Sequence, residues 1–153
     1  MLKVRCPQDL KKFENYDLGC SDWFLIDQEL INSFAKLSGD DQWIHVDTDR
    51  ALNEMPGGKT IAHGLLTLCI SPSLGKHKIH IEFLKHTLNY GIDKVRFMSP
   101  VKVGSFIRLK SKIAQVTLRD DDSVLLRIER IMEIKATERL AMYAETLSLM
   151  YPA

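Results

Sequence analysis

Two residues suited to acid–base chemistry lie close together near position 40. Asp40 and His45 are five positions apart, and Gly39 directly precedes them. A carboxylate and an imidazole that hydrogen-bond one water can remove its proton and return a proton elsewhere. On an α-helix, residues five apart point about 140° away from each other. The pair therefore converges only if the backbone between them is irregular, and Gly39 predicts such a break because glycine commonly ends helices.

The spacing of these residues leaves two alternatives open. Asp41 follows Asp40 immediately, and residue type alone does not separate the two carboxylates. Aspartate and histidine are also common loop residues, so an aspartate that caps a helix beside a half-buried His45 is the ordinary structural interpretation.

Gly64 is the third candidate, about twenty residues further along the chain. If a helix begins near His63, its first N–H groups have no intrahelical partner, and the helix dipole adds partial positive charge there. Glycine permits close approach because it has no side chain. This pattern predicts a backbone N–H that stabilises negative charge on a carbonyl oxygen. The alternatives are that Gly64 only packs closely and that His63 has a structural role.

Helical elements are expected on both sides of this stretch. Asp27 is a good N-cap, and Leu30, Ile31, Phe34 and Leu37 recur at helical spacing up to Gly39. A second, short helix is expected to begin at Asp47 or Thr48. Residues 61–73 are apolar nearly all round, which predicts a buried helix.

Strands follow in the second half of the chain. The pattern predicts strands at about 105–116 and 140–150, and a hairpin loop at 119–123. The clearest strand places Leu126, Ile128, Met132, Ile134 and Ala136 on one face, interrupted by Arg130. Long antiparallel strands with one buried face need an extended element to wrap. We therefore expect a single α+β domain, 1–153, with a curved antiparallel sheet around the helix after Gly64.

Composition and charge exclude several functional classes. Net charge is +1 without a basic block, so neither nucleic acid nor an acidic membrane surface is an expected partner. The apolar run Leu65–Ile70 is far shorter than the roughly 18–20 residues that span a bilayer. Three scattered cysteines and an N-terminus without a signal-like apolar region predict a reduced, cytoplasmic location.

Two further patterns do not amount to sites. Gly57–Thr60 is similar to the end of a phosphate-binding loop, but that motif requires glycine where this chain has Asn53. His77, His80 and His86 form a loose group without an acidic or thiolate ligand to complete it. The sequence therefore predicts no metal site.

Taken together, the central motifs resemble a known family. Ser38–Asp47 followed by Ile61–Gly64 is similar to the hydratase signature of MaoC-like dehydratase domains, which include (R)-specific enoyl-CoA hydratases. The flanking segments Leu18–Trp23 and Tyr90–Phe97, with Gln28 and Phe34-Ala35 between them, look like those of the nodulation protein N-like branch.

The resemblance implies a hotdog fold, a homodimer and a hydratase or dehydratase of 2-enoyl-CoA and (R)-3-hydroxyacyl-CoA thioesters. Asp40 and His45 would be the catalytic pair, and the Gly64 N–H would hold the thioester oxygen. The expected substrate-binding residues are Gln42, Trp43 and His63.

Many members of the family have Asn-Pro where this chain has Gln42-Trp43, and the bulkier tryptophan could narrow the acyl pocket. Coenzyme A is expected as part of the substrate, with an acyl carrier protein as the alternative, and no metal or redox cofactor is needed. Two rival functions are a thioesterase on the same fold and a non-catalytic acyl-thioester-binding accessory protein.

Overall fold

The computed structural model describes residues 1–153, and its largest element is an antiparallel sheet of six strands. The sheet order is β2 (Asp17–Cys20), β6 (Phe106–Leu118), β7 (Val124–Ile134), β8 (Leu140–Pro152) and β5 (Leu84–Phe97), and β3 (Phe24–Leu25) also pairs with β6. Outside this sheet, β1 (Leu2–Val4) and β4 (Ile79–Ile81) form a parallel pair beside the 3₁₀ helix η1 (Pro7–Phe13). The α+β class and the antiparallel sheet are confirmed.

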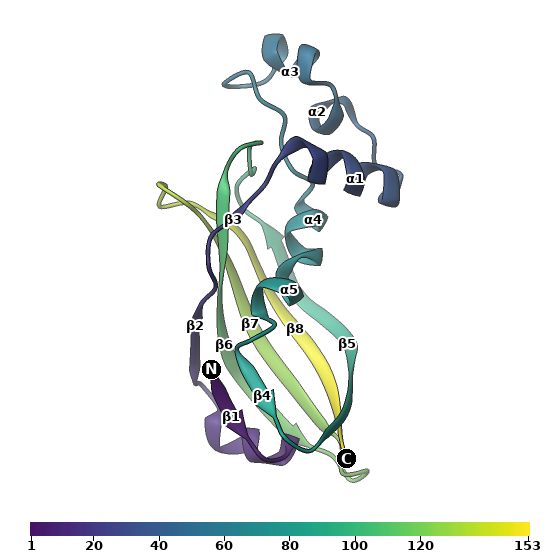
Figure 1. Ribbon diagram of the computed structural model, residues 1–153, viewed down its shortest axis with the longest axis vertical. Coiled ribbons are helices and arrows are strands. Elements are labelled where there is room, and N and C mark those ends of the chain that lie inside the picture. The colour runs from purple at the N-terminus through teal and green to yellow at the C-terminus, as the bar shows by residue number, and fades with distance from the viewer.

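The sheet curves around two short helical segments. Register shifts interrupt the pairing of β5 with β8 at three places and that of β6 with β7 at one. Such bulges bend a strand and increase its twist. Figure 1 shows the long strands curving behind α4 (Gly64–Cys69) and α5 (Ser71–Gly75). This is the hotdog arrangement that the family resemblance implied.

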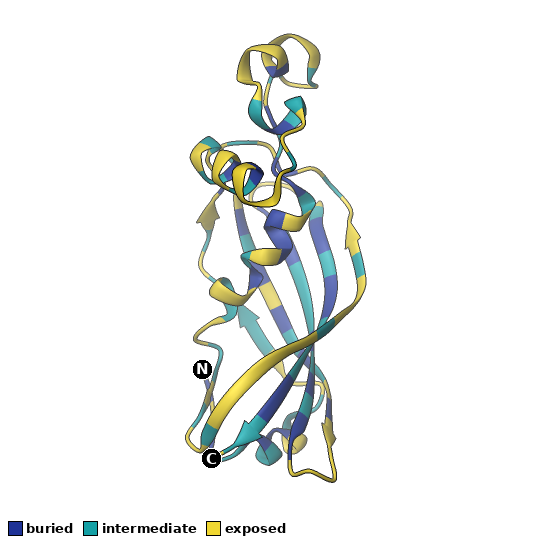
Figure 2. Cartoon of the chain, turned by 90° about the vertical axis from the view of Figure 1, so that its right-hand side faces the viewer, coloured by how far each residue is buried: buried dark blue, intermediate teal, exposed yellow.

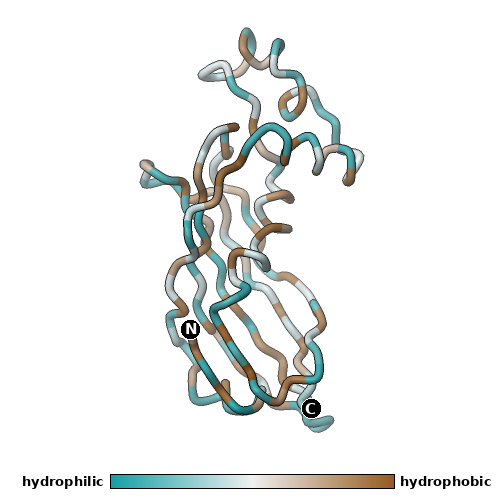
Figure 3. Tube along the Cα trace, in the orientation of Figure 1, coloured by the Kyte–Doolittle hydropathy of each residue, from teal (hydrophilic) through white to brown (hydrophobic).

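One face of β7 is buried and has the alternation that the sequence predicts. Leu126, Ile128, Met132 and Ile134 are all buried, and Figure 3 shows the matching alternation of hydrophobic and hydrophilic residues along the strands. Ala136 was wrongly placed on this face. It lies beyond the end of β7, exposed, with a φ of 60° in the turn that leads to β8.

The central helix is shorter and less regular than the expected span of 61–73. It begins at Gly64 and is interrupted at Ile70, after which α5 continues to Gly75. Pro72 explains the interruption, because proline has no N–H to donate and its ring disfavours a helical conformation for the preceding turn. Figure 2 shows the buried side of α4 turned toward the sheet.

Three helices stand beyond one end of the sheet (Figure 1): α1 (Gln28–Ser38), α2 (Trp43–Val46) and α3 (Thr48–Glu54). Asp27 caps α1 by accepting a hydrogen bond from the Leu30 N–H, and Gly39 ends it with a φ of 78°. Asp47 caps α3 in the same way, through the Arg50 N–H. Both expected helix starts are confirmed.

The buried stripe of α1 differs in one position from the expected one. Ile31 and Ala35 are buried, whereas Leu37 is 84% exposed. Leu37 lies two residues beyond Ala35, about 160° around the helix, and so faces away from the sheet.

No helix in the structure has the length and apolarity needed to cross a membrane.

Candidate active site

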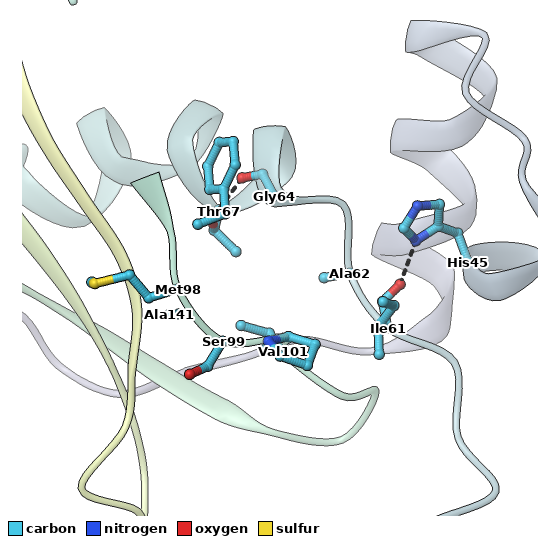
Figure 4. A pocket seen from close by; sticks show the side chains of 11 residues that line it. His45, Ile61, Ala62, Gly64, Thr67, Met98, Ser99, Val101 and Ala141 are labelled. Atoms are coloured by element: carbon cyan, nitrogen blue, oxygen red, sulfur yellow. Dashed lines mark hydrogen bonds between the residues drawn. The ribbon is translucent and has the colours of Figure 1, made fainter. Parts of the chain in front are cut away.

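A cavity of about 290 Å³ lies beside the start of α4, where the end of β5 and the loop after it approach that helix. Its lining includes His45, Gly64, Thr67, Phe97 and Ala141. Figure 4 shows His45 at one end, beside Ile61, and Gly64 and Thr67 along one wall. Six of the eleven lining residues are hydrophobic, so the few polar groups determine how a ligand is oriented.

The His45 ring is held in one tautomer. His45 is buried on α2, and its Nδ1 lies 2.7 Å from the carbonyl oxygen of Ile61. Because a carbonyl oxygen can only accept, Nδ1 donates its hydrogen there, and Nε2 of the neutral ring carries a lone pair. Nε2 makes no hydrogen bond within the chain and is therefore available to accept a proton.

His63 connects the loop around Asp40 to this ring. Its Nε2 donates a hydrogen bond to the backbone carbonyl of Asp40 at 2.8 Å, and its ring stacks on His45 with centroids 3.7 Å apart. His63 is buried, and its Nδ1 has no hydrogen-bond partner. The histidine thus positions the backbone of Asp40 directly and supports the catalytic candidate His45 by packing.

Asp40, His45 and His63 converge. One potential ligand atom from each residue lies within 4.8 Å of the corresponding atoms of the other two. Asp41 is exposed and does not belong to this group. The irregular backbone that the sequence argument required is present, because α1 ends at Gly39 and α2 begins only at Trp43. A carboxylate with two imidazoles is also a set that could coordinate a transition metal.

Gly64 occupies the first position of α4, and its N–H donates no hydrogen bond within the chain. A Cβ at this position would lie 2.6 Å from Cγ of Phe97, far inside van der Waals contact. Thr67 donates a hydrogen bond from its hydroxyl to the Gly64 carbonyl at 2.6 Å. Only glycine fits here without displacing Phe97, and its amide remains free at the cavity.

Gln28 connects three segments of the site and was missed as a functional residue. Its Nε2 donates to the His45 carbonyl at 2.7 Å, and its Oε1 accepts from the buried Thr60 hydroxyl at 2.5 Å. It also contacts Asn32 of the same helix. Its position in the first turn of a capped helix gave no sign of contacts 17 and 32 residues away.

The remaining predicted residues lie around the cavity rather than in its wall. Gln42 donates from its side chain to Oδ1 of Asp40 at a long 3.4 Å. Trp43 is covered by the guanidinium of Arg50, 4.0 Å from its ring centre, and does not line the cavity. The binding roles of Gln42, Trp43 and His63 stay predictions.

Similarity to known proteins agrees with this geometry. Residues 13–131 match the family described as the MaoC like domain. The chain is 39% identical over 139 residues to 3-hydroxyacyl-thioester dehydratase Z of Mycobacterium tuberculosis, covering 91% of each protein. It is also 39% identical over 136 residues to nodulation protein N of Rhizobium leguminosarum bv. viciae, covering 87% of this chain and 83% of that protein.

The fold also matches a solved structure. A monoamine oxidase regulatory protein from Archaeoglobus superposes with a TM-score of 0.81 over 100% of this chain and 99% of its own, at 19% identity. The match of most of the chain to the domain family, and the two relatives at 39% identity, lead to one conclusion: this protein belongs to the MaoC-like dehydratase domain family.

Proposed function

We propose that this protein adds water to 2-enoyl thioesters, giving (R)-3-hydroxyacyl thioesters, and catalyses the reverse dehydration, with coenzyme A as the acyl carrier. One observation carries the proposal. A carboxylate oxygen of Asp40 and a ring nitrogen of His45 lie within 4.8 Å of each other, and His45 lines a cavity whose wall also presents the free N–H of Gly64. The relative named 3-hydroxyacyl-thioester dehydratase Z supports the same reaction class.

In the hydration direction, water attacks C3, loses one proton, and C2 gains one. Asp40 orients the water and withdraws its proton, while His45 shares the same water. Since Nδ1 of His45 is engaged with Ile61, Nε2 is the atom that exchanges the proton with C2. In hydration a protonated Nε2 gives its proton to C2, and the proton that Asp40 took from water then passes to Nε2 and restores both groups; in dehydration the lone pair of Nε2 accepts the proton from C2. The pair thus takes one proton from water and returns one to carbon, and addition on a single face is syn.

Negative charge develops on the thioester oxygen as C3 is attacked. The Gly64 N–H has no partner in the chain and can donate to that oxygen without breaking an existing bond. Removal of a comparable backbone or side-chain donor in other enzymes costs roughly 10²–10³ in turnover. The thioester itself activates the double bond, so the proposed reaction uses neither a metal nor a redox cofactor.

The direct test follows two products in parallel. Purified protein is mixed with crotonyl-CoA, and loss of enoyl absorbance is recorded beside release of free thiol. Hydration predicts loss of enoyl absorbance without free thiol, and chiral analysis predicts the (R)-3-hydroxy product. Thiol release would instead identify a thioesterase. Saturable binding of crotonyl-CoA without either change would identify a non-catalytic binding protein.

The assembly that we propose is a homodimer formed along β5. This strand is an edge of the sheet, 14 residues long, and exposes Leu88, Tyr90, Ile92 and Phe97. An edge with unpaired backbone groups and apolar side chains is suited to pairing with a second copy. Sedimentation should give twice the mass of 17.5 kDa, and Ile92→Lys should shift the protein toward the monomer.

A further inference from the structure

A second cavity, of about 570 Å³, lies farther along the same helical segment, between α4, α5 and the strands β5, β7 and β8. Arg130 reaches it from β7, on the strand face where Ile128 and Met132 are buried. Every other lining residue is uncharged; the polar ones include Ser71, Asn89 and Ser148. The cavity therefore contains a single positive charge and no carboxylate.

Arg130 has neutral partners only. Its Nε donates to the Thr146 hydroxyl at 2.9 Å, and its Nη1 donates to the Ser71 carbonyl at 3.2 Å. It forms no ion pair, although the arginines Arg108 and Arg127 of the same sheet do. A guanidinium has five N–H donors in a planar fork. Donors consequently remain for a ligand.

Burial of the charged Arg130 side chain is energetically unfavourable. Burial lowers the pKa of Arg130, since the charged form loses hydration without gaining a counter-ion. Gly75 makes room for the guanidinium: a Cβ there would lie 3.0 Å from Nη1 of Arg130. A desolvated guanidinium with free donors, at the wall of a cavity, is suited to binding an anion that enters from outside.

This cavity and the candidate active site lie along the same helix and strands. The first is lined by Gly64 of α4 and Phe97 of β5, and the second by Ser71 and Ile92 of the same helical segment and strand. At a rise of 1.5 Å per residue, Ser71 is about 10 Å from Gly64 along the helix axis. An acyl chain that runs from a thioester at Gly64 along this helical segment would therefore bring its far end to Arg130.

We propose that the cavity at Arg130 binds a carboxylate at the far end of the acyl chain, so that the favoured substrates are ω-carboxyacyl thioesters of medium length. The inference rests on the proposed function. A carboxylate fits better than a phosphate, because one planar guanidinium matches its two oxygens and no second cation is present. Apolar residues such as Leu68, Ile92 and Leu147 contact the methylene groups of the chain.

Binding of saturated acyl-CoAs tests this cavity without requiring turnover. Calorimetry compares adipoyl-, suberoyl- and sebacoyl-CoA with methyl-ended acyl-CoAs of equal carbon number. The intact protein should favour the carboxyl-ended ligand by about tenfold or more at the best chain length, as expected for a charge-assisted hydrogen bond. Arg130→Met should lower that ratio to about one, and Arg130→Lys should retain part of it. Arg119→Gln, an exposed arginine in the β6–β7 loop, should leave the ratio unchanged.

A second variant keeps the proposal testable if the first one does not fold. If Arg130→Met does not fold, Thr146→Val removes the acceptor that orients Nε and should reduce the ratio without weakening binding of the methyl-ended ligand. No carboxyl preference at any length in the intact protein, or an undiminished preference in these variants, would overturn the inference. Arg130-dependent binding of free suberate without a preference for suberoyl-CoA would overturn it in favour of an effector site.

The two proposals fail in different ways. An Arg130-dependent preference in binding without any hydration of enoyl-CoAs would reject the proposed reaction and retain the carboxylate site. Hydration of crotonyl-CoA without any carboxyl preference would retain the reaction and reject the site.

Discussion

The imidazole rings of His45 and His63 stack with their centroids 3.7 Å apart and their planes inclined by 25°. Each ring donates one hydrogen to a backbone carbonyl, His45 to Ile61 and His63 to Asp40. The two hydrogen bonds link the same two segments in opposite directions. The Ile61 carbonyl fixes the ring of His45 on α2, and His63, two residues after Ile61, fixes the backbone of Asp40 in the loop before α2. The position of the proposed acid–base pair therefore depends on both segments together.

Replacement of either member of the proposed pair should abolish most of the activity. Asp40→Asn and His45→Gln should each lower turnover of crotonyl-CoA by about 10²–10⁴, because each removes one proton-transfer group. Circular dichroism and the melting temperature should stay close to those of the parent. Asp41→Asn is the matched control and should be nearly fully active, since that carboxylate is exposed outside the group. Parent-like turnover in Asp40→Asn would reject the assignment.

Gln28→Met should reduce both stability and turnover. It keeps the size of the side chain but leaves the His45 carbonyl and the Thr60 hydroxyl without their partner. An unsatisfied buried group costs about 1–3 kcal/mol, so urea unfolding should show a loss of this order. The control Asn32→Ala removes only the exposed contact of Gln28 and should change neither quantity measurably. An unchanged unfolding midpoint in Gln28→Met would show that these two hydrogen bonds contribute nothing to the stability of the fold.

Gly64→Ala should clash with Phe97, whose ring atoms would lie 2.6–2.9 Å from the new methyl group. Overpacking of this kind typically costs about 1–3 kcal/mol, and the displaced amide should also lower turnover. In the double variant Gly64→Ala/Phe97→Ala the clash is absent, so the two losses of stability should be less than additive. Strict additivity in that double-mutant cycle would argue against direct contact.

The pH dependence of stability should report on Glu145. The Lys94 ammonium and then the Arg127 guanidinium hydrogen-bond this buried carboxylate and hold its pKa below the ordinary value of 4.5. The folded state therefore favours the ionised form, and its contribution is complete above pH 4.5 and is lost as the pH falls below that value. In Glu145→Gln the free energy of unfolding should fall less steeply below pH 4.5. An unaltered slope would contradict this, and the exposed Glu138→Gln serves as the control.

Removal of metal ions should leave the activity intact. The proposed reaction draws its activation from the thioester, so dialysis against a chelator should not change turnover of crotonyl-CoA. Added Zn²⁺ should inhibit, because Asp40, His45 and His63 could bind it at the place that water requires. Loss of turnover on chelation with recovery on one added metal would show that the mechanism is incomplete.

Local patterns predicted the elements with strong boundary signals. Asp27 and Gly39 bound α1 because one side chain caps the first turn and the other residue tolerates a φ of 78°. The alternation along β7 was readable because one strand face is buried. Pro72 and Gly75 were expected to mark the fraying end of the central helix, and the helical segment does end at Gly75 but is interrupted before Pro72. The exposure of Leu37 depends on how α1 is rotated against its neighbours.

The site was predictable to the extent that its residues share a motif. Asp40, His45 and Gly64 were identified as candidates; His45 and Gly64 line one cavity and Asp40 lies beside His45, while their chemical roles stay predictions. Phe97 comes from the end of β5, and Gln28 acts through contacts with segments far along the chain. Both positions are among those that carry the family resemblance, but no local pattern gives them a role in the site, because the contacts arise only when the sheet closes around the helix.

If the chain pairs along β5 as proposed, the long exposed edge of this strand makes the assembly of the protein depend on its concentration. The unpaired backbone groups of an edge strand can pair with a strand of another chain, and burial of the exposed apolar side chains of β5 would stabilise such a contact. In a dilute sample, where a second copy is rarely bound, this surface would be exposed to solvent and could associate non-specifically with other proteins. Pairing with a second copy and aggregation with other proteins would then compete for the same unpaired backbone amides of β5.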